Sequence, residues 1–387
     1  MPRPIFAIAD VHIANHKAFG GEVRSSINKR CRYTLNVLSD AVNMCHKENG
    51  VLVVVGDLFD VTRPEASVIA EVQRILEPVE AILIKGNHDS NSDQPNDHAM
   101  APLRPVATVI EEPTIIKVGT TNLWCAPSDP RQTESWLPDV LGRLAKSRSA
   151  ADNDALFIHT GISDPKTPKF LGAVKDQIPA HTLAGLCAQH GLTHVFAGNW
   201  HNRKDWKISR DGLDVHIQQI GALVPTGWDN EGLHGYGGVA KFHAQKTTMI
   251  EVPGPRFIKV RGDLEDVRNL LRKVKDSSLL YIKVLCSPDS LTDTTEFMAE
   301  LVTRGIIAAQ SVVVDKVYRT AAAHSAAHSA RNAENADKAL EYYINRMPLG
   351  DKLMGLLSDG EEQVFREKLI NAARELISKV SSDGRSR

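Results

Sequence analysis

The sequence has little of several features that would define its class at once: long apolar runs, paired cysteines and charge of one sign. No stretch approaches the ~20 consecutive apolar residues of a membrane-spanning helix, so no membrane association is expected. The five cysteines form no C-x-x-C pair, which argues against a disulfide framework or a zinc ribbon and favours a reducing cytoplasm. The 46 Lys and Arg nearly balance the 47 Asp and Glu, so any site for a polyanion must be local.

Short β-branched runs alternate with longer amphipathic patterns over the first third of the chain. We expect strands at 5–9, 51–55 and 81–84, and helices at about 26–48 and 64–77. Strands that alternate with helices in this way are typical of βαβ units, in which the sheet is largely parallel. The pattern therefore predicts an α/β fold.

Polar side chains follow each of these three strands directly. Asp10 and His12 come after the first strand, Asp57 after the second, and Gly86-Asn-His-Asp89 after the third. Ligands bind beyond the carboxyl ends of the strands in open α/β sheets, so the three strand exits point to one site. Carboxylates crowded at such a rim repel one another unless cations neutralise them. The sequence therefore predicts a divalent metal site.

Two later strands end in the same way. Residues 156–158 lead into His159, and residues 194–197 lead into Gly198-Asn-Trp-His201. Oxygen and imidazole ligands without thiolate suit Mn, Fe or Zn, and one bridging carboxylate can hold two ions about 3.5–4 Å apart for a phosphoryl displacement. Motifs of other chemistries are absent, since the chain has no G-x-S-x-G elbow and no G-x-x-x-x-G-K-[ST] loop.

The remainder of the chain suggests a second sheet and two further regions. Residues 215–220, 239–243 and 247–252 are expected to form a late antiparallel set, within a second sheet that packs on the first. Turn residues at 253–255 mark the predicted boundary of the first domain. Residues 256–320 then alternate strands and helices in a small α+β unit, and residues 321–387 are typical of a linker followed by a helical tail.

Five separated motifs together resemble the calcineurin-like metallophosphoesterases. In chain order they are Asp10-Val-His12, Gly56-Asp-Leu-Phe-Asp60, Gly86-Asn-His-Asp89, His159 and Gly198-Asn-Trp-His201. The resemblance implies a calcineurin-like four-layer αββα sandwich over residues 1–255. Residues 56–64 and 220–226 are most similar to the SbcD-type nuclease subunit of bacterial SbcCD and related meiotic-recombination (MR) repair complexes, some of them phage-encoded.

The resemblance also implies a site with two divalent metal ions, with Mn as the expected metal and Mg, Fe and Zn as the alternatives. One ion would be held by Asp10, His12, Asp57 and His201, and the other by Asp57 as a bridge together with Asn87 and His159. His88 would stand beside the scissile phosphate and act on the leaving oxygen, with Asp89 orienting its imidazole.

One position departs from the family pattern. Where the family usually has Gly-His-x-His, this chain has Gly198-Asn-Trp-His201, so Asn199 replaces a histidine ligand of the second metal. An amide oxygen can still ligate, but it is a weaker donor for Mn or Zn than imidazole, so the second ion is expected to bind more loosely. The change also leaves open a non-catalytic scaffold built on the same fold.

The resemblance implies a metal-dependent DNA exonuclease and endonuclease that hydrolyses phosphodiester bonds at DNA ends in repair, recombination or replication. It further implies that residues 256–320 cap the DNA and that residues 321–387 bind an SbcC-type coiled-coil ATPase, in the host cytoplasm if the chain is phage-encoded. Basic residues within 24–32 and 203–210 are candidates for contacts with DNA phosphates. A stand-alone phosphatase or cyclic-nucleotide phosphodiesterase is the alternative enzyme, and a homodimer is left open.

Overall fold

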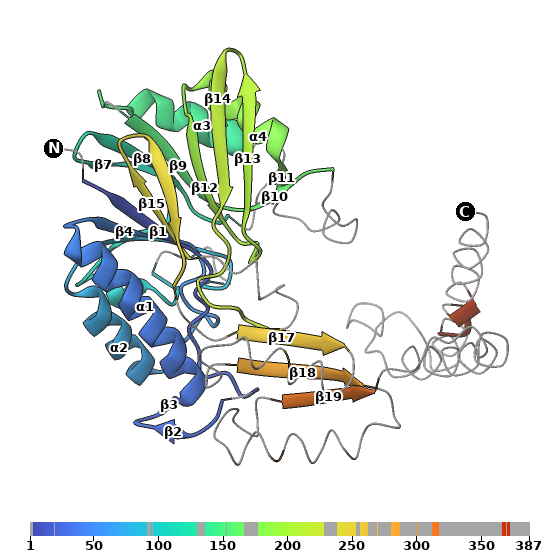
Figure 1. Ribbon diagram of the computed structural model, residues 1–387. Helices are drawn as coiled ribbons and strands as arrows, with labels where there is room; N and C mark the ends of the chain where they lie inside the picture. The colour runs from blue at the N-terminus through green and yellow to red at the C-terminus, as the bar shows by residue number, and fades with distance from the viewer. Residues whose placement is uncertain are drawn as a thin grey trace, which may run out of the picture. The chain divides into compact units, whose positions relative to one another are not determined.

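The structure is a computed structural model that divides into two compact units, Met1–Val317 and Tyr318–Arg387 (Figure 1). It describes residues 3–18, 20–90, 94, 96–129, 136–151, 153–165, 177–227, 238–252, 256–261, 269, 280–286, 299, 312–316, 366–368 and 370–371. Nearly all of the predicted tail at 321–387 and of the helices expected within 256–320 lies outside these residues. The predicted boundary near residue 255 and the predicted roles of the two later regions stay predictions.

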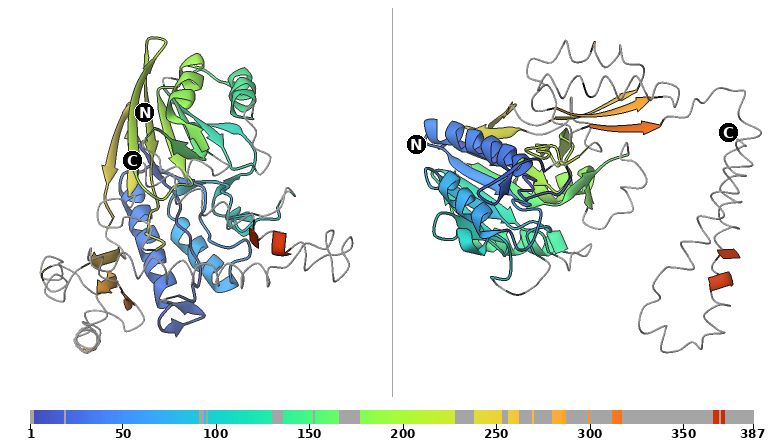
Figure 2. Two further views of the ribbon diagram at one scale, coloured as in Figure 1. Left: turned by 90° about the vertical axis from the view of Figure 1, so that its right-hand side faces the viewer. Right: turned by 90° about the horizontal axis from the view of Figure 1, so that it is seen from below.

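The first large sheet has six strands in the order β16-β15-β1-β4-β5-β6. Their bounds are β1 Ile5–Ile8, β4 Val51–Val55, β5 Glu80–Ile84, β6 Thr108–Ile110, β15 Val239–His243 and β16 Lys246–Ile250. Strands β1, β4, β5 and β6 run parallel, as the alternating pattern predicts, whereas β15 pairs antiparallel with β1. Helices α1 (Lys29–Lys47) and α2 (Ala66–Leu76) lie side by side along this sheet (Figures 1 and 2).

The second large sheet also has six strands, in the order β13-β14-β12-β9-β8-β7. Their bounds are β7 Thr114–Val118, β8 Thr121–Ala126, β9 Asn153–His159, β12 His194–Gly198, β13 Lys204–Arg210 and β14 Leu213–Gln219. Strands β8, β9, β12 and β14 are parallel, and β7 and β13 close the two edges antiparallel. Helices α3 (Trp136–Ser147) and α4 (Ala180–Gln189) accompany this sheet.

Three apolar layers hold these elements together. One joins α1 and α2 to the first sheet, one joins α3 and α4 to the second sheet, and the third fills the space between the sheets with residues such as Val53, Phe157 and Phe196. Each sheet is therefore buried on both faces, which explains why central strands such as Val51–Val55 are apolar throughout. The predicted four-layer αββα sandwich is confirmed.

The side chain of Asn28 determines where helix α1 begins. The predicted stripe through Cys31, Leu35 and Leu38 is buried, as periodicity requires. The helix begins at Lys29, three residues later than predicted, because the side chain of Asn28 accepts a hydrogen bond from the backbone N–H of Cys31 at 2.8 Å and caps the first turn. Residues just before it form the short hairpin β2 (Val23–Arg24) and β3 (Ile27–Asn28).

The predicted late antiparallel set is wrong in its connections. Strand β14 runs parallel to β12 in the second sheet, whereas β15 and β16 form a hairpin that extends the first sheet. The sequence pattern predicts only a basic cluster at 203–210, where the structure has strand β13. An Asp211-Gly212 turn with positive φ at both residues (50° and 80°) joins β13 to β14, which is a strong hairpin signal.

The remaining described elements are short. They are the 3-10 helix η1 (Ala101–Leu103), the pair β10 (Gly161–Ser163) and β11 (Gln177–Pro179), and the parallel sheet β17 (Arg256–Arg261), β18 (Leu280–Cys286) and β19 (Val312–Lys316). The last three agree with strands expected in the region 256–320. In the part of the chain that the structure describes, no helix has the length and apolar character to cross a membrane.

Candidate metal centre

The loops after β1 and β4 pair with each other and bring their polar residues together. The backbone N–H of Asp10 donates to the carbonyl of Gly56 at 3.2 Å, and that of His12 donates to the carbonyl of Asp57 at 3.0 Å. Asp10, His12 and Asp57 all have positive φ, at 50°, 51° and 50°. Such conformations are costly for residues other than glycine and cluster where a site demands them.

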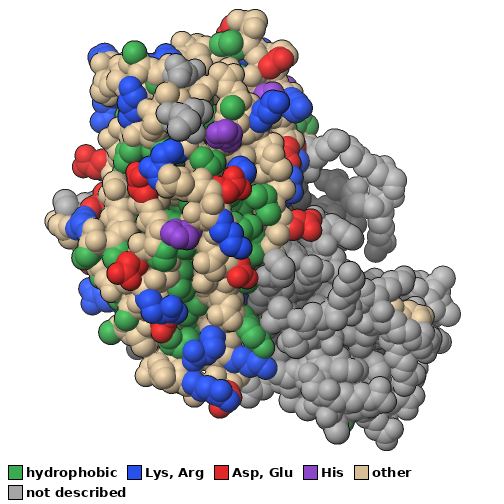
Figure 3. All heavy atoms as spheres, turned by 60° about the vertical axis from the view of Figure 1, so that its left-hand side comes forward, with side chains coloured by type: hydrophobic (Ala, Val, Ile, Leu, Met, Phe, Trp, Pro, Cys, Tyr) green, Lys and Arg blue, Asp and Glu red, His purple; other side chains and the backbone are tan. Residues whose placement is uncertain are grey.

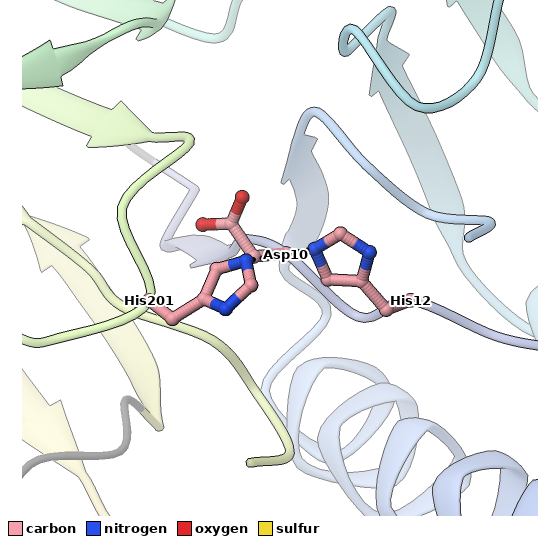
Figure 4. Close-up of side chains that lie close together, drawn as sticks. All are labelled: Asp10, His12 and His201. Atoms are coloured by element: carbon pink, nitrogen blue, oxygen red, sulfur yellow. Dashed lines mark hydrogen bonds between the residues drawn. The ribbon is translucent and has the colours of Figure 1, made fainter. Parts of the chain in front are cut away.

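Three donor groups form one half of the cluster: Asp10, His12 and His201, whose ligating atoms lie within 4.8 Å of one another. Figure 4 shows the three side chains close together, with Asp10 and His12 on the loop after β1 and His201 on the loop after β12. The Nε2 atoms of His12 and His201 are 3.0 Å apart. Their convergence on the Asp10 carboxylate is the arrangement expected of ligands around one cation.

The other half of the cluster is built around His159 at the end of β9. Its Nε2 lies 2.9 Å from Oδ1 of Asn87 and 3.3 Å from Oδ2 of Asp57. Its Nδ1 lies 2.9 Å from the carbonyl oxygen of Val55, which fixes the ring and favours a proton on that nitrogen. Nε2 is then the atom available to a cation, next to carboxylate and amide oxygens.

Asp57 connects the two halves. Its Oδ2 lies 3.3 Å from Nε2 of His159 and 3.8 Å from Nε2 of His12, and its Oδ1 accepts a hydrogen bond from the backbone N–H of His88 at 2.9 Å. Burial acts to raise the pKa of Asp57, but the imidazoles of His159, His12 and His88 outweigh it and hold the pKa below its ordinary value. The carboxylate is therefore ionised and placed to bridge two cations.

Two glycines allow this close approach. A side chain at Gly56, where φ is +81°, would place its Cβ 1.9 Å from Nδ1 of His159. A Cβ at Gly86 would lie 2.1 Å from Oδ1 of Asp57. Both contacts are far inside any real Cβ distance, so the glycines of the Gly56-Asp57 and Gly86-Asn87 turns are required by the ligands themselves.

The backbone N–H of Asn199 contacts the cluster. Its N–H points at the carboxylate of Asp10, 2.9 Å from Oδ1 and 3.1 Å from Oδ2, and its φ is 82°. Burial raises the pKa of Asp10 to about 6, with His159 opposing and Asp57 adding to the rise. The predicted role of the Asn199 side chain as a metal ligand stays a prediction.

The predicted partner of His88 is wrong. Asp89 is fully buried, and its carboxylate accepts hydrogen bonds from the backbone N–H groups of Gly86, Asp57 and Phe59 at 2.9, 3.1 and 3.1 Å. The Asp89 carboxylate links the loop after β5 to the loop after β4, because backbone N–H groups of both loops donate to its two oxygens. Asp89 is therefore a positioning residue for the loops and not for the imidazole.

Asp60 has the role that the sequence reasoning gave to Asp89. Its Oδ1 lies 2.8 Å from Nδ1 of His12 and 3.4 Å from Nδ1 of His88, and the three residues form a further cluster of close donor atoms. The hydrogen bond with Asp60 raises the pKa of His88 to about 9. The signal was present in the sequence, since Asp60 stands three residues after Asp57 in Gly56-Asp-Leu-Phe-Asp60.

The donor set fits divalent metal ions. Burial acts to lower the pKa of His159, but Asp57 and Asp10 raise it to about 10, so without a cation the ring holds a proton among carboxylates. A bound cation takes the place of that proton. Imidazole nitrogens, carboxylate oxygens and one amide oxygen, with no thiolate among them, suit Mn, Fe or Zn.

The two basic clusters are only partly available for other contacts. Arg30 is buried and donates to the carbonyls of Ala18 and Thr226, and Lys204 pairs with Asp164 at 2.7 Å. Over the face in Figure 3, positive and negative side chains are interspersed among the described residues. That distribution agrees with the net charge of -1 and with a local site for anions.

A family model of calcineurin-like phosphoesterases matches residues 3–203, which is just over half of the chain and includes every predicted site residue. The chain belongs to the calcineurin-like phosphoesterase family. Members of this family are metal-dependent phosphoester hydrolases, so the cluster around Asp57 is the candidate active site of such a hydrolase.

Solved structures with a similar fold include three phosphoester hydrolases of low identity. Purple acid phosphatase PPD1 from yellow lupin seeds is 13% identical over 64% of this chain and 50% of its own, with a TM-score of 0.40. A dimetal phosphatase from Danio rerio is 14% identical over 63% and 93% (TM-score 0.36), and a putative 5'-nucleotidase from Staphylococcus aureus is 12% identical over 65% and 53% (TM-score 0.39). This chain thus spans about half the length of the lupin protein.

The search of curated proteins gives no match to this chain. The family assignment therefore rests on the family model and on the geometry of the cluster.

Proposed function

We propose that the protein is a metal-dependent nuclease that hydrolyses phosphodiester bonds in DNA. One observation carries the proposal: a single ionised carboxylate, Asp57, lies between two groups of imidazole and carboxylate donors, beside an imidazole that is 46% exposed. Two cations bridged by a carboxylate, with a proton donor at their edge, are suited to displacement at phosphorus.

The residues of the chain have distinct tasks in this proposal. Asp10, His12, Asp57 and His201 would hold one ion, and Asp57, Asn87 and His159 the other. When bound, the ions supply positive charge at the phosphate and lower the pKa of a bound water. His88, kept protonated by Asp60, is placed to give a proton to the leaving oxygen. Asp89 and the two glycines keep the loops in register.

The exposure of His88 supports a diester over a small monoester. The ligands Asp10, His12, Asp57 and His159 are all at most 2% exposed, whereas the His88 side chain reaches the surface. A substrate that continues on both sides of its phosphate can therefore lie across this rim, with its leaving group at His88. This feature favours a phosphodiesterase over a stand-alone phosphatase that acts on monoesters.

One assay tests the proposal. The purified full chain is incubated with labelled linear duplex DNA, single-stranded DNA, a chromogenic phosphodiester and a chromogenic phosphomonoester, each with Mn, Mg, Zn or chelator. We expect cleavage of linear duplex DNA and of the diester with Mn, and none with chelator. Hydrolysis of the monoester alone would identify a phosphatase, and no hydrolysis under any condition would favour a scaffold.

We also propose that residues 321–387 bind a coiled-coil ATPase of the SbcC type and that residues 256–320 contact DNA. The support is the sequence resemblance of residues 56–64 and 220–226, together with the apolar residues Phe365, Leu369 and Ala373, which are spaced four apart in the sequence as on one face of a helix. Truncation after Arg319 should leave hydrolysis of the chromogenic diester intact and remove co-purification with the ATPase. An unchanged pull-down would contradict the role of the tail.

A further inference from the structure

A groove of about 840 Å³ opens at one edge of the sandwich, away from the metal cluster. Its walls come from β12, β13 and β14 of the second sheet and from the β15–β16 turn and β16 of the first sheet. The β15–β16 hairpin and the strands β12, β13 and β14 can be followed in Figure 1. Most pockets that bind small ligands have volumes of about 300–1,000 Å³, so the groove has the size of a ligand site.

The space between the sheets changes character as it reaches this edge. At the centre it is filled by stacked apolar rings, with Phe157 and Phe196 4.9 Å apart and Phe242 beside them. At the edge, the inward positions of β12 and β14 carry His194 and His216 instead, with ring centroids 5.3 Å apart. Nδ1 of His194 lies 3.0 Å from Oγ1 of Thr193, so this ring has a polar partner within the protein, whereas His216 is the partly exposed ring of the pair.

The charges in the groove leave cations available. Three cationic side chains, Arg203, Lys207 and Lys246, line the groove together with two carboxylates, Asp205 and Asp214, and Arg203 pairs with Asp205 at 3.6 Å. Lys207 and Lys246, which line the groove from opposite sheets, make no ion pair or hydrogen bond within the described residues. Two exposed ammonium groups that face one groove are suited to an anion.

An uncharged pair of rings adds shape. His194 is buried and packs between His216 and Phe242, and burial together with the neighbouring His216 lowers the pKa of His194 to about 4, so its ring is neutral. The groove thus offers the partly exposed ring of His216 for stacking.

We propose that this groove is a second binding site, for a nucleoside phosphate, either free or as a unit of a single strand. The phosphate would contact Lys207 and Lys246, and the base would stack on His216. Bases stack on flat side chains without sequence preference, and phosphates pair with lysines. The site agrees with the proposed DNA substrate but does not require hydrolysis.

The groove lies apart from the metal cluster, and most of its residues lie outside the segment that matches the family model. His194 begins β12 and lies about 13 Å, or four strand residues, from Gly198 at the carboxyl end where the metal ligands gather. Arg203 is the groove residue nearest in sequence to the ligand His201. Residues 205–218 and 245–249, which form most of the walls, lie beyond the segment 3–203 that matches the family model.

Binding without hydrolysis tests the proposal. AMP is titrated by calorimetry and a fluorescent oligothymidylate by anisotropy, both against the full chain in chelator. We expect the double variant Lys207→Gln/Lys246→Gln to bind about tenfold more weakly and His216→Ala to weaken binding without a change of charge. The matched control Lys47→Gln/Lys146→Gln removes two exposed charges outside the groove and should bind as the wild type does. All variants are first checked for unchanged thermal unfolding.

The two probes separate the two sources of the ligand. Parallel losses for AMP and the oligonucleotide indicate a free nucleotide site, whereas a loss for the oligonucleotide alone indicates a path for a strand. For the oligonucleotide, the slope of log K against log salt should shrink by about 0.7, the value for one phosphate on a single strand. Equal affinities of the groove variant and the wild type for both probes would overturn the proposal. Because no cleavage is measured, this result is independent of nuclease activity.

Discussion

The metal cluster and the edge groove use histidine in opposite ways, although both include residues of β12 or of the loop that follows it. His159 and His194 are both buried. Burial lowers the pKa of each ring, but Asp57 and Asp10 beside His159 raise its pKa to about 10, whereas His194 packs against His216 and Phe242 and its pKa falls to about 4. The neighbours, not the burial, decide the charge state.

The difference extends to the ligands that each region is suited to bind. In the metal cluster, three carboxylates and four imidazoles lie close together, most of them buried, so the site favours a cation. In the groove, three cationic side chains accompany two carboxylates, and Lys207 and Lys246 make no ion pair within the described residues, so an anion is favoured. One sandwich therefore offers a cation site at the carboxyl ends of its strands and an anion site at its open edge.

Removing the bridge should have the largest effect. Asp57→Ala takes a donor from both halves of the cluster at once, so we expect Mn-dependent cleavage of duplex DNA to fall on the order of 10³-fold or more. Asp139→Ala, which removes an exposed carboxylate on α3, is the control and should cleave normally. Nucleotide binding in the groove should persist in the Asp57 variant. Undiminished cleavage would refute the assigned bridge.

Asp60 acts through other residues, so its loss should cost less. Asp60→Asn keeps the shape of the side chain but weakens its contacts with His12 and His88, and we expect the rate to fall about 10–100-fold. The pH profile should also shift, because His88 loses the carboxylate that raises its pKa to about 9. Glu77→Gln on the surface is the control. A lower rate with an unchanged pH profile would argue for a structural role alone.

The sequence predicted the metal cluster better than the groove, because the metal ligands stand directly beside predicted strands, whereas the groove residues come together only through strand pairing. Asp10, Asp57 and His159 each follow an apolar strand directly, so the carboxyl ends of parallel strands were enough to bring them together. Lys207 and Lys246 become neighbours only through the pairing of β13 with β14 and of β15 with β16 in different sheets. That pairing depends on tertiary contacts, and there the sequence reasoning failed.

The partner of His88 shows a second limit of the same kind. Asp89 is adjacent to His88 in sequence, and adjacency made it the expected orienting group. In the structure, the carboxylate of Asp89 accepts hydrogen bonds from three backbone N–H groups of the adjacent loops. The carboxylate beside the His88 ring belongs to Asp60, 28 positions earlier in the sequence. Backbone donors left free by tight turns compete for nearby acceptors, and sequence distance does not reveal the outcome.

Asn199 offers a milder test of the metal cluster. If its amide is the weak ligand of the second ion, Asn199→His should lower the Mn concentration that gives half-maximal cleavage severalfold, since imidazole is the better donor. The rate is measured against Mn concentration with the chromogenic diester. The neighbouring variant Asn202→His, on an exposed residue outside the cluster, is the control. A flat response would indicate that Asn199 acts on the cluster through its backbone N–H, which donates to Asp10, and not through its side chain.

The smallest expected effect concerns stability at the groove. The pKa of His194 in the folded chain, about 4, lies below its ordinary value of 6.5, so the unfolded chain takes up a proton first as the pH falls. The stabilisation that comes from the neutral ring is therefore complete above pH 6.5 and is lost between about pH 6.5 and 4. His194→Gln should flatten that part of the curve of urea midpoint against pH, relative to the wild type under the same conditions. His181→Gln, at an exposed position on α4, should follow the wild type. Parallel curves for the wild type and His194→Gln would mean that His194 takes up its proton without loss of packing, and that the groove accepts a charged ring.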